Sequence, residues 1–246
     1  MTKKLLLMAM LAMLATSFVA CDKSDDDSNN DDNINVVDLG LPSGIKWAKM
    51  NVGATNPWDF GNYYAWGETE TKSDYNWETY KYCNGNYNKI TKYCNKADCG
   101  NDGFTDTLVT LESADDVATA VLGADYSMPT AVDWNELCSQ CYWVWTSKYE
   151  GRDISGYIVY KAKSDGDKGV KVFGDGTPSA IYSLTDVHIF LPAAGYIGVG
   201  RYGCYWSSSL YGSSLASNCS FDSNGVYSSW TSDRCFGWSV RPVKRP

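Results

Sequence analysis

The sequence predicts an α+β fold, in which two helices are combined with many short strands and long ordered loops. The composition holds 18 Tyr, 10 Trp and 22 Gly but seven Pro, and such a composition favours strands and turns over helix bundles. Two segments carry helix-capping signals, and several others alternate between apolar and polar residues as strands do.

The N-terminus predicts an exported protein. Two lysines precede the apolar stretch Leu5–Ala15, which is too short for a comfortable membrane span, so residues 1–20 are expected to be a signal peptide. The cysteine after Ala20 resembles that of a bacterial lipobox, in which the chain is cut before Cys21 and that thiol is lipidated. The alternative is ordinary secretion with cleavage near Ala20.

Residues 21–35 are expected to form a flexible acidic tether. Asp22–Asn35 has no aromatic and almost no apolar residue, so it cannot bury enough surface to order itself. Acidic residues this close to a lipidated cysteine resemble the surface-export signal of Bacteroidetes-type lipoproteins. We therefore expect an acyl anchor that holds the protein on the outer face of the outer membrane, with a periplasm-facing tether as the alternative.

The charge balance excludes nucleic acid from the expected partners. Cleavage after residue 20 removes two positive charges and no acid, which takes the formal net charge from −8 to −10. Because neutralisation of phosphates by Lys and Arg supplies most of the affinity for nucleic acids, such a chain is a poor binder of them.

Residues 36–246 are expected to form one domain, because no Pro-rich or charged linker interrupts them. Asn35–Gly53 predicts a strand, a turn at Pro42–Gly44 and a second strand. Tyr63–Trp66 is a candidate strand. Residues 71–107 are polar and predict an irregular loop region.

Two segments predict helices. The first is Glu112–Leu122, where Ser113 and Asp116 stand at capping-box spacing and Gly123 follows as a stop signal. The second is Pro129–Cys138, and its capping-box residues and expected buried stripe are Thr130 with Asp133, and Val132, Trp134 and Leu137.

The remaining candidates are strands separated by turns. Apolar and polar residues alternate most clearly in "YIVYKAK" and "GWSVRPV". The candidate strands are Trp143–Thr146, Ile154–Lys161, His188–Leu191, Cys204–Ser208, Asn218–Asp222, Gly225–Trp230 and Trp238–Pro242.

Six motifs, in this order, cover most of residues 36–243: "VDLGLPSGIKWAKMNVG", "GNYYAWGE", "MPTAVDWNELC", "IFLPAAGY", "YWSSS" and "WSVRPV". Together they resemble the Fibrobacter succinogenes major paralogous domain, a family common in lipoproteins of gut and oral bacteria. The resemblance implies a C-type-lectin-like fold related to sulfatase-modifying-factor proteins. Two helices would then pack on small twisted antiparallel sheets with long irregular loops. Most members of the family have no established activity.

The chain has nine cysteines, and Cys21 leaves eight. An even number in an exported chain predicts disulfides. We expect local pairs: Cys94 with Cys99 or Cys83, and two of Cys204, Cys219 and Cys235 across neighbouring strands. Cys138 and Cys141 would close the second helix at its C-terminal end, where the helix dipole disfavours a thiolate, so they are interpreted as a crosslink. The alternative is that some cysteines stay free. The disulfide candidates are Cys83, Cys94, Cys99, Cys138, Cys141, Cys204, Cys219 and Cys235.

The sequence shows no recognisable catalytic constellation. Formylglycine-generating enzymes, which share the implied fold, use two closely spaced cysteines, whereas Cys204 stands alone in the matching segment. One C-x-x-C motif with a single histidine does not supply a zinc site, and the calcium-binding motifs of C-type lectins do not occur. His188 is expected to pack or to form a satisfied hydrogen bond. We predict a non-catalytic protein without a cofactor or a bound metal.

Aromatic residues gather in the Gly- and Ser-rich last third of the chain. Flat rings beside hydroxyls and amides suit stacking on sugars or peptide recognition, although aromatics also fill cores. We predict a binding module for a glycan or a protein, with a remnant of a sulfatase-modifying-factor-like enzyme and a structural envelope component as alternatives. The candidate ligand-binding residues are Tyr196, Arg201, Tyr205, Trp206, Tyr211 and Trp230, in a cluster that also holds Tyr202 and Tyr227.

Overall fold

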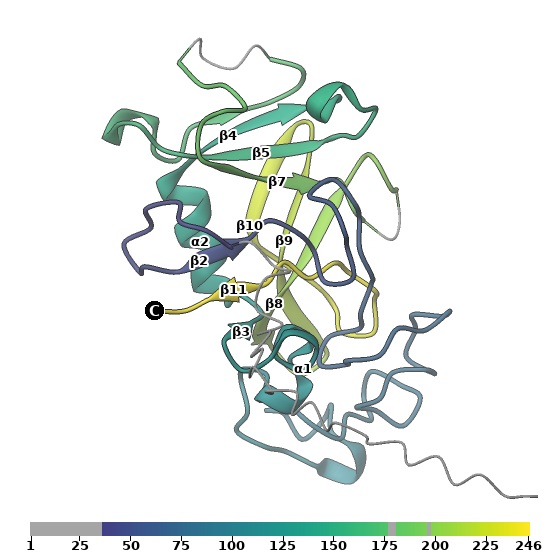
Figure 1. Cartoon of the computed structure of the whole chain (residues 1–246). Helices are drawn as coiled ribbons and strands as arrows, with labels where there is room; N and C mark the ends of the chain where they lie inside the picture. Colours follow the sequence, from purple (N-terminus) through teal and green to yellow (C-terminus); the bar gives the residue numbers. More distant parts are fainter. Residues whose placement is uncertain (1–35, 177–180, 196–197) are drawn as a thin grey trace, which may run out of the picture. The chain divides into compact units, whose positions relative to one another are not determined.

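A computed structural model describes residues 36–176, 181–195 and 198–246 (Figure 1). These residues belong to one compact unit, Ile34–Pro246. Two α-helices are combined with three small sheets, which confirms the predicted α+β class. The features predicted outside the described residues are the signal peptide at 1–20, the lipidation site Cys21, the tether at 21–35 and Tyr196.

The first sheet joins the beginning and the end of the described chain. Its strand order is β1-β2-β11-β3, and all neighbours are antiparallel. The predicted strand, turn and strand at the N-terminal side are confirmed. The predicted strand Trp238–Pro242 is confirmed only in part: Trp238 and Ser239 form isolated bridges to Tyr64 and Tyr205, and the regular strand starts after Pro242. The strands are β1 (Val36–Val37), β2 (Lys46–Ala48), β3 (Tyr126–Ser127) and β11 (Val243–Lys244).

The second sheet has the order β6-β4-β5-β7. β6 runs parallel to β4, and the other neighbours are antiparallel. Three of these strands match predicted ones within two residues at either end, whereas the two-residue β6 was not predicted. The strands are β4 (Cys141–Thr146), β5 (Gly156–Lys161), β6 (Lys171–Val172) and β7 (His188–Pro192).

The third sheet is an antiparallel meander in the order β10-β9-β8. Each strand is longer than the sequence predicts, and the added residues are Gly203 and Ser209–Tyr211 in β8, Leu215–Ser217 in β9 and Thr231–Asp233 in β10. The pairing register shifts once between β10 and β9 and once between β8 and β9, as at a β-bulge. The strands are β8 (Gly203–Tyr211), β9 (Leu215–Asp222) and β10 (Gly225–Asp233).

The second predicted helix is confirmed as α2, Ala131–Gln140. Thr130 is its N-cap, and the capping box is complete: the Asp133 N–H donates to the Thr130 hydroxyl at 3.2 Å, and the Thr130 N–H donates to the Asp133 carboxylate at 2.7 Å. Trp134 lies in the predicted buried stripe. Val132 does not, since it is 74% exposed.

The first helix is shorter than predicted. Ser113–Asp115 forms a 3-10 turn, and α1 covers Val117–Leu122. Asp116 is its N-cap rather than its third residue, and the carboxylate accepts from the Thr119 N–H at 3.1 Å. Among the described residues, Ser113–Asp115 is η3, and the other 3-10 turns are η2 (Asn101–Gly103), η4 (Tyr149–Gly151) and η5 (Asp165–Asp167).

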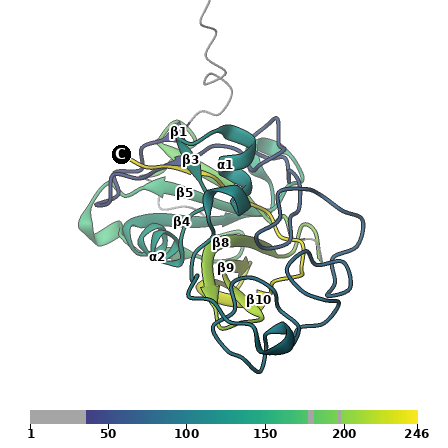
Figure 2. The same cartoon turned by 90° about the horizontal axis from the view of Figure 1, so that it is seen from below.

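The main core lies where α2 meets strands of all three sheets. Trp134 contacts Trp47 of β2, with ring centroids 4.6 Å apart, and Tyr205 of β8, with centroids 5.9 Å apart. All three side chains are fully buried, and buried rings of this size dominate the energetics of a core. Figure 2 shows α2 beside β4 and the β8-β9-β10 sheet.

The segment 71–107 has long irregular loops, as predicted, and a buried carboxylate fixes part of it. Asp115 accepts hydrogen bonds from the hydroxyls of Tyr82 and Tyr93 and from the ammonium of Lys92. Burial raises the pKa of Asp115, but these hydrogen bonds outweigh burial and hold the pKa below its usual value. The carboxylate therefore stabilises the fold in its ionised form.

Arg234 connects the same loops to the end of β10. Its buried guanidinium donates to the carbonyl oxygens of Tyr93 and Lys92, both at 2.9 Å, and of Ser213 at 2.7 Å. It also lies 4.8 Å from the ring centroid of Trp66, a cation–π contact. These bonds satisfy loop carbonyls that burial would otherwise leave without partners.

The eight described cysteines are all free thiols, so the predicted crosslinks are not formed in this structure. A pair between Cys204 and Cys219 is also wrong on geometric grounds. Cys204 stands opposite Ser220, while Cys219 stands opposite Tyr205. Because successive residues of a strand project to opposite faces, the two thiols lie on different sides of the sheet.

Cys138 of α2 contacts Cys219 of β9. Both belong to the main core, and the pKa of the Cys219 thiol is raised well above its usual value, first by burial and then by a hydrogen bond with Cys138. The sequence paired Cys138 with Cys141 instead, because residues three apart on a helix are neighbours. The structure offers Cys138 a second neighbour that is 81 positions away in the chain.

Candidate ligand-binding site

Two of the predicted ligand-binding residues are buried. Tyr205 and Trp206 are both fully buried, so the prediction that they contact a ligand at the surface is wrong. The Tyr205 hydroxyl donates to the carbonyl of Pro192 at 2.7 Å, and the Trp206 indole N–H donates to that of Tyr64 at 2.8 Å. The side chains project to opposite faces of β8, and each face is covered by its own core.

Arg201, Tyr202 and Tyr211 are exposed, but they do not form one site with each other. Arg201 and Tyr202 lie in the loop immediately before β8, whereas Tyr211 is the last residue of that strand. A strand of nine residues separates the two positions, so one small ligand cannot contact both groups.

Trp230 is exposed, and Tyr227 lies beside it on β10. Each side chain is 54% exposed, and the ring centroids are 5.6 Å apart at an interplanar angle of 53°. Residues three apart on a regular strand project to opposite faces. Here the register shift between Tyr227 and Trp230 inserts one residue, so both rings lie on the same face.

Hydroxyl groups flank these two rings. Tyr227 stands opposite Ser220 of β9, and Ser232 lies two residues beyond Trp230 on the same face. Ser220 and Ser232 are half-buried, and the Asn218 amide donates to the Ser232 hydroxyl at 2.9 Å. We call the surface formed by Tyr227, Trp230, Ser220 and Ser232 the aromatic face.

The aromatic face is held from behind and from one end. The hydroxyls of Ser228 and Ser229 donate to the Asn135 side-chain oxygen of α2 at 2.6 and 3.0 Å. At the hairpin end, a Cβ on Gly225 would lie 3.1 Å from the Tyr227 hydroxyl oxygen, so the tyrosine ring lies close over this backbone. These contacts pre-organise the rings, which lowers the entropic cost of binding.

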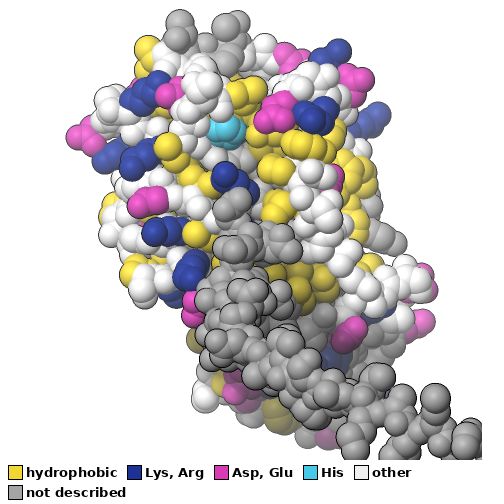
Figure 3. Space-filling model, viewed as in Figure 1, with side chains coloured by type: hydrophobic (Ala, Val, Ile, Leu, Met, Phe, Trp, Pro, Cys, Tyr) yellow, Lys and Arg dark blue, Asp and Glu magenta, His cyan; other side chains and the backbone are white. Residues whose placement is uncertain are grey.

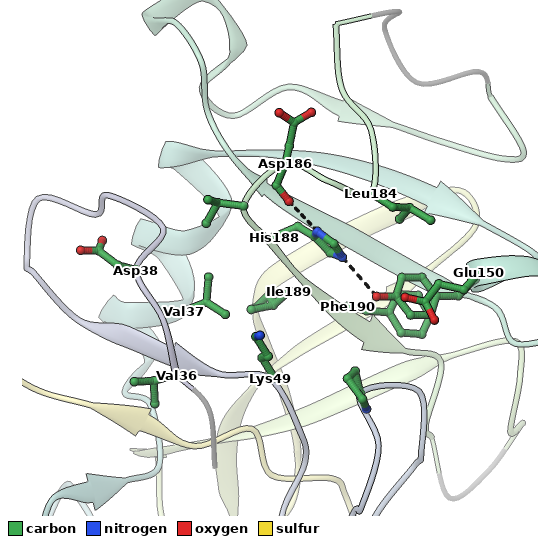
Figure 4. A pocket seen from close by; sticks show the side chains of 13 residues that line it. Val36, Val37, Asp38, Lys49, Glu150, Leu184, Asp186, His188, Ile189 and Phe190 are labelled. Carbon is green, nitrogen blue, oxygen red and sulfur yellow. Dashed lines mark hydrogen bonds between the residues drawn. The ribbon is translucent and has the colours of Figure 1, made fainter. Parts of the chain in front are cut away.

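A cavity of about 570 Å³ opens on a different part of the molecule, beside β7 (Figure 4). We call it the His188 pocket. His188 Nδ1 donates to the Asp186 carbonyl at 2.8 Å, and Nε2 then accepts from the Tyr149 hydroxyl, 3.1 Å away. This bonding confirms the expected satisfied hydrogen bond of the single histidine. Figure 3 shows hydrophobic side chains beside this histidine.

Two of the described thiols, those of Cys141 and Cys204, are poorly placed for nucleophilic chemistry. Burial raises the pKa of Cys204 to about 11, and burial with the nearby Cys138 raises that of Cys141 to about 12. A thiolate is the reactive form of cysteine, and these values keep both thiols protonated at neutral pH. Within the described ranges, no three His, Cys, Asp or Glu side chains are grouped so that they could hold a metal ion.

The sequence predicts Trp230 as a ligand-binding residue, but it does not predict the side chains that lie around Trp230 in the structure. The sequence does not distinguish the exposed Trp230 from the buried Trp206, since both lie in segments that contain serines and glycines. Ser220 and Ser232 were missed because the bulge breaks the alternation that would place them beside the rings. The His188 pocket was missed because its walls come from distant parts of the chain.

Comparisons with known proteins gave no match: no family model, no curated protein and no solved structure is similar to this chain. None of the helices in the described part of the chain is both long and apolar enough to cross a membrane.

Proposed function

We propose that this protein is a surface-anchored, non-catalytic lipoprotein whose domain binds a neutral glycan at the aromatic face. The observation that supports this function is the exposed pair Tyr227 and Trp230, held on one face of β10 by the bulge. Two large rings that are each half exposed, and that are fixed by contacts behind them, are costly to leave in water. A ligand that covers them removes this cost.

The chemistry of the aromatic face favours a sugar. The apolar face of a sugar ring packs on the flat ring of Trp or Tyr, and its hydroxyl groups need donors and acceptors at the edge. Ser220 and Ser232 offer hydroxyls beside the rings, and no ion pair of the described residues involves any of the four side chains. A protein ligand is the other partner predicted from the sequence, and it becomes the remaining candidate if the protein binds no oligosaccharide in the test below.

The proposed location of the protein, on the outer face of the outer membrane, rests on its N-terminal sequence. Lipidation at Cys21 would anchor the protein in the outer membrane, and the acidic tether would extend the domain away from the lipid surface. The C-type-lectin-like relationship is likewise carried by the six sequence motifs. The α+β class of the structure is compatible with it.

An array of immobilised neutral oligosaccharides tests this function. The purified protein should bind a subset of them, and a Tyr227→Ala/Trp230→Ala double variant with an unchanged melting temperature should bind none. A Tyr202→Ala/Tyr211→Ala double variant is the matched control, because it removes two exposed tyrosines elsewhere and should bind as the original does. Equal binding by the two double variants, or no binding by the original protein, would reject the aromatic face as a glycan site.

A further inference from the structure

The His188 pocket lies beside a buried positive charge with which no carboxylate of the described residues pairs. Arg241 is fully buried, and its guanidinium donates only to neutral groups: the Asn51 side chain at 2.8 Å and three backbone carbonyls. Burial lowers the pKa of Arg241 to about 10, so it is still protonated at neutral pH. A buried ion without an opposite charge leaves a strong positive potential nearby.

Arg241 also fixes two walls of the pocket. It donates to the carbonyl of Lys49, just after β2, at 2.8 Å, and to the carbonyl of Phe190 in β7 at 2.9 Å. Its charge reaches the pocket as well, since Arg241 and Tyr149 influence each other's pKa. The potential of this guanidinium is therefore felt inside the cavity.

A second cation points into the pocket. Figure 4 shows the Lys49 side chain directed between Val37 and Ile189. Among the described residues, Lys49 has no hydrogen-bond or ion-pair partner for its ammonium group. An ammonium group that lines a cavity without a partner is free to bind an anion.

The three acidic residues at the rim already have partners. Asp186 pairs with Lys163 at 2.8 Å, and Glu150 pairs with Arg152 at 2.9 Å. Asp38 accepts the Gly40 N–H at 2.8 Å, and Figure 4 shows its carboxylate directed away from the cavity. These carboxylates therefore oppose an incoming anion only weakly.

The rest of the lining is largely apolar. Val37 and Ile189 are buried walls, whereas Leu184 and Val187 are 44% and 49% exposed at the rim. A ligand that covers these side chains would gain free energy from burial of apolar surface. A cavity of this size accommodates a small molecule but not a protein domain.

We propose that the His188 pocket binds a small molecule that carries one carboxylate and an apolar body. The carboxylate pairs with Lys49 above the buried Arg241, and the apolar body lies along Val37, Ile189 and Leu184. This site is independent of the aromatic face, which lies on β10 and needs no charge.

Octanoate, octanol and octylammonium are suitable probes, because they share a chain length and differ in charge. Titration of the purified protein, followed by NMR chemical shifts, should show binding in the order octanoate, octanol, octylammonium. Hexanoate, which is shorter than octanoate by two methylene groups, should bind more weakly than octanoate, by about fourfold for each of these groups. The shifts should map to Lys49, Ile189 and the His188 ring.

A Lys49→Gln variant should weaken octanoate binding about fivefold, the effect of one solvent-accessible ion pair, and leave octanol binding unchanged. The control is Lys46→Gln, which removes the same charge from β2 at an exposed position outside the cavity lining. Binding of octylammonium as tight as octanoate, an unaffected Lys49→Gln variant, shifts that map to the aromatic face, or no binding of octanoate would each overturn the proposal.

Discussion

Replacement of Trp230 by alanine should weaken glycan binding without unfolding the protein. A tryptophan side chain presents up to about 250 Å², of which 54% is exposed here. A sugar ring that covers half of this exposed part removes about 70 Å² from water, which contributes about 1.7 kcal/mol at about 25 cal/mol per Å². The dissociation constant should therefore rise about 15-fold.

The assay is isothermal titration calorimetry with the oligosaccharide that binds best on the array. Tyr211→Ala is the matched control, because Tyr211 is 58% exposed and belongs to the same sheet, but is the last residue of β8, which β9 separates from β10. Its dissociation constant should not change. The reasoning is refuted if Tyr211→Ala weakens binding as much as Trp230→Ala, or if Trp230→Ala has no effect while the fold stays intact.

Three other predictions concern the core, the cysteines and the anchor. Asp115→Asn should lower stability by about 1–3 kcal/mol at pH 7. Because the pKa of Asp115 is lowered by folding, its contribution is present above about pH 4 and is lost as the pH falls. Melting curves should therefore show a smaller loss at acid pH for the variant, and parallel curves would contradict this. Refolding of the unfolded protein with oxidised glutathione, which makes the buried thiols accessible, should crosslink Cys138 to Cys219, each sulfur losing one proton and one electron as glutathione is reduced. Closing a loop of about 80 residues should add about 4 kcal/mol, and peptide mapping that finds Cys138 bound to Cys141 would count against the contact. Cys21→Ala should abolish incorporation of labelled palmitate in a bacterial host, and continued incorporation would disprove lipidation there.

The second helix could be predicted because its signals are local. Thr130 and Asp133 form the expected capping box, and Trp134 lies in the core as its spacing suggests. The same spacing placed Val132 in the buried stripe, but α2 is covered on one side only. A helix pattern identifies the apolar side chains, and only the packing partners decide which of them are covered.

The candidate site could be predicted only in part, because exposure depends on contacts between distant residues. Trp206 and Trp230 belong to the two outer strands of one sheet, β8 and β10, yet Trp206 is covered by Trp238, whose ring centroid lies 6.5 Å away. Tyr227 lies beside Trp230 because of one bulge, and neither the composition nor the alternation of apolar and polar residues predicts that bulge. Likewise, Arg241 connects Lys49 to Phe190 across intervals of 192 and 51 positions in the chain.

The central claim is that a glycan lies on Trp230, and the indole N–H signals of the protein test it directly. The chain has 10 tryptophans, and a Trp230→Phe variant identifies the signal of Trp230 in a ¹H–¹⁵N spectrum. On saturation with the oligosaccharide selected on the array, the Trp230 signal should move most, while those of the buried Trp47, Trp134 and Trp206 should stay. A Trp230 signal that stays in place while the oligosaccharide binds would contradict the account.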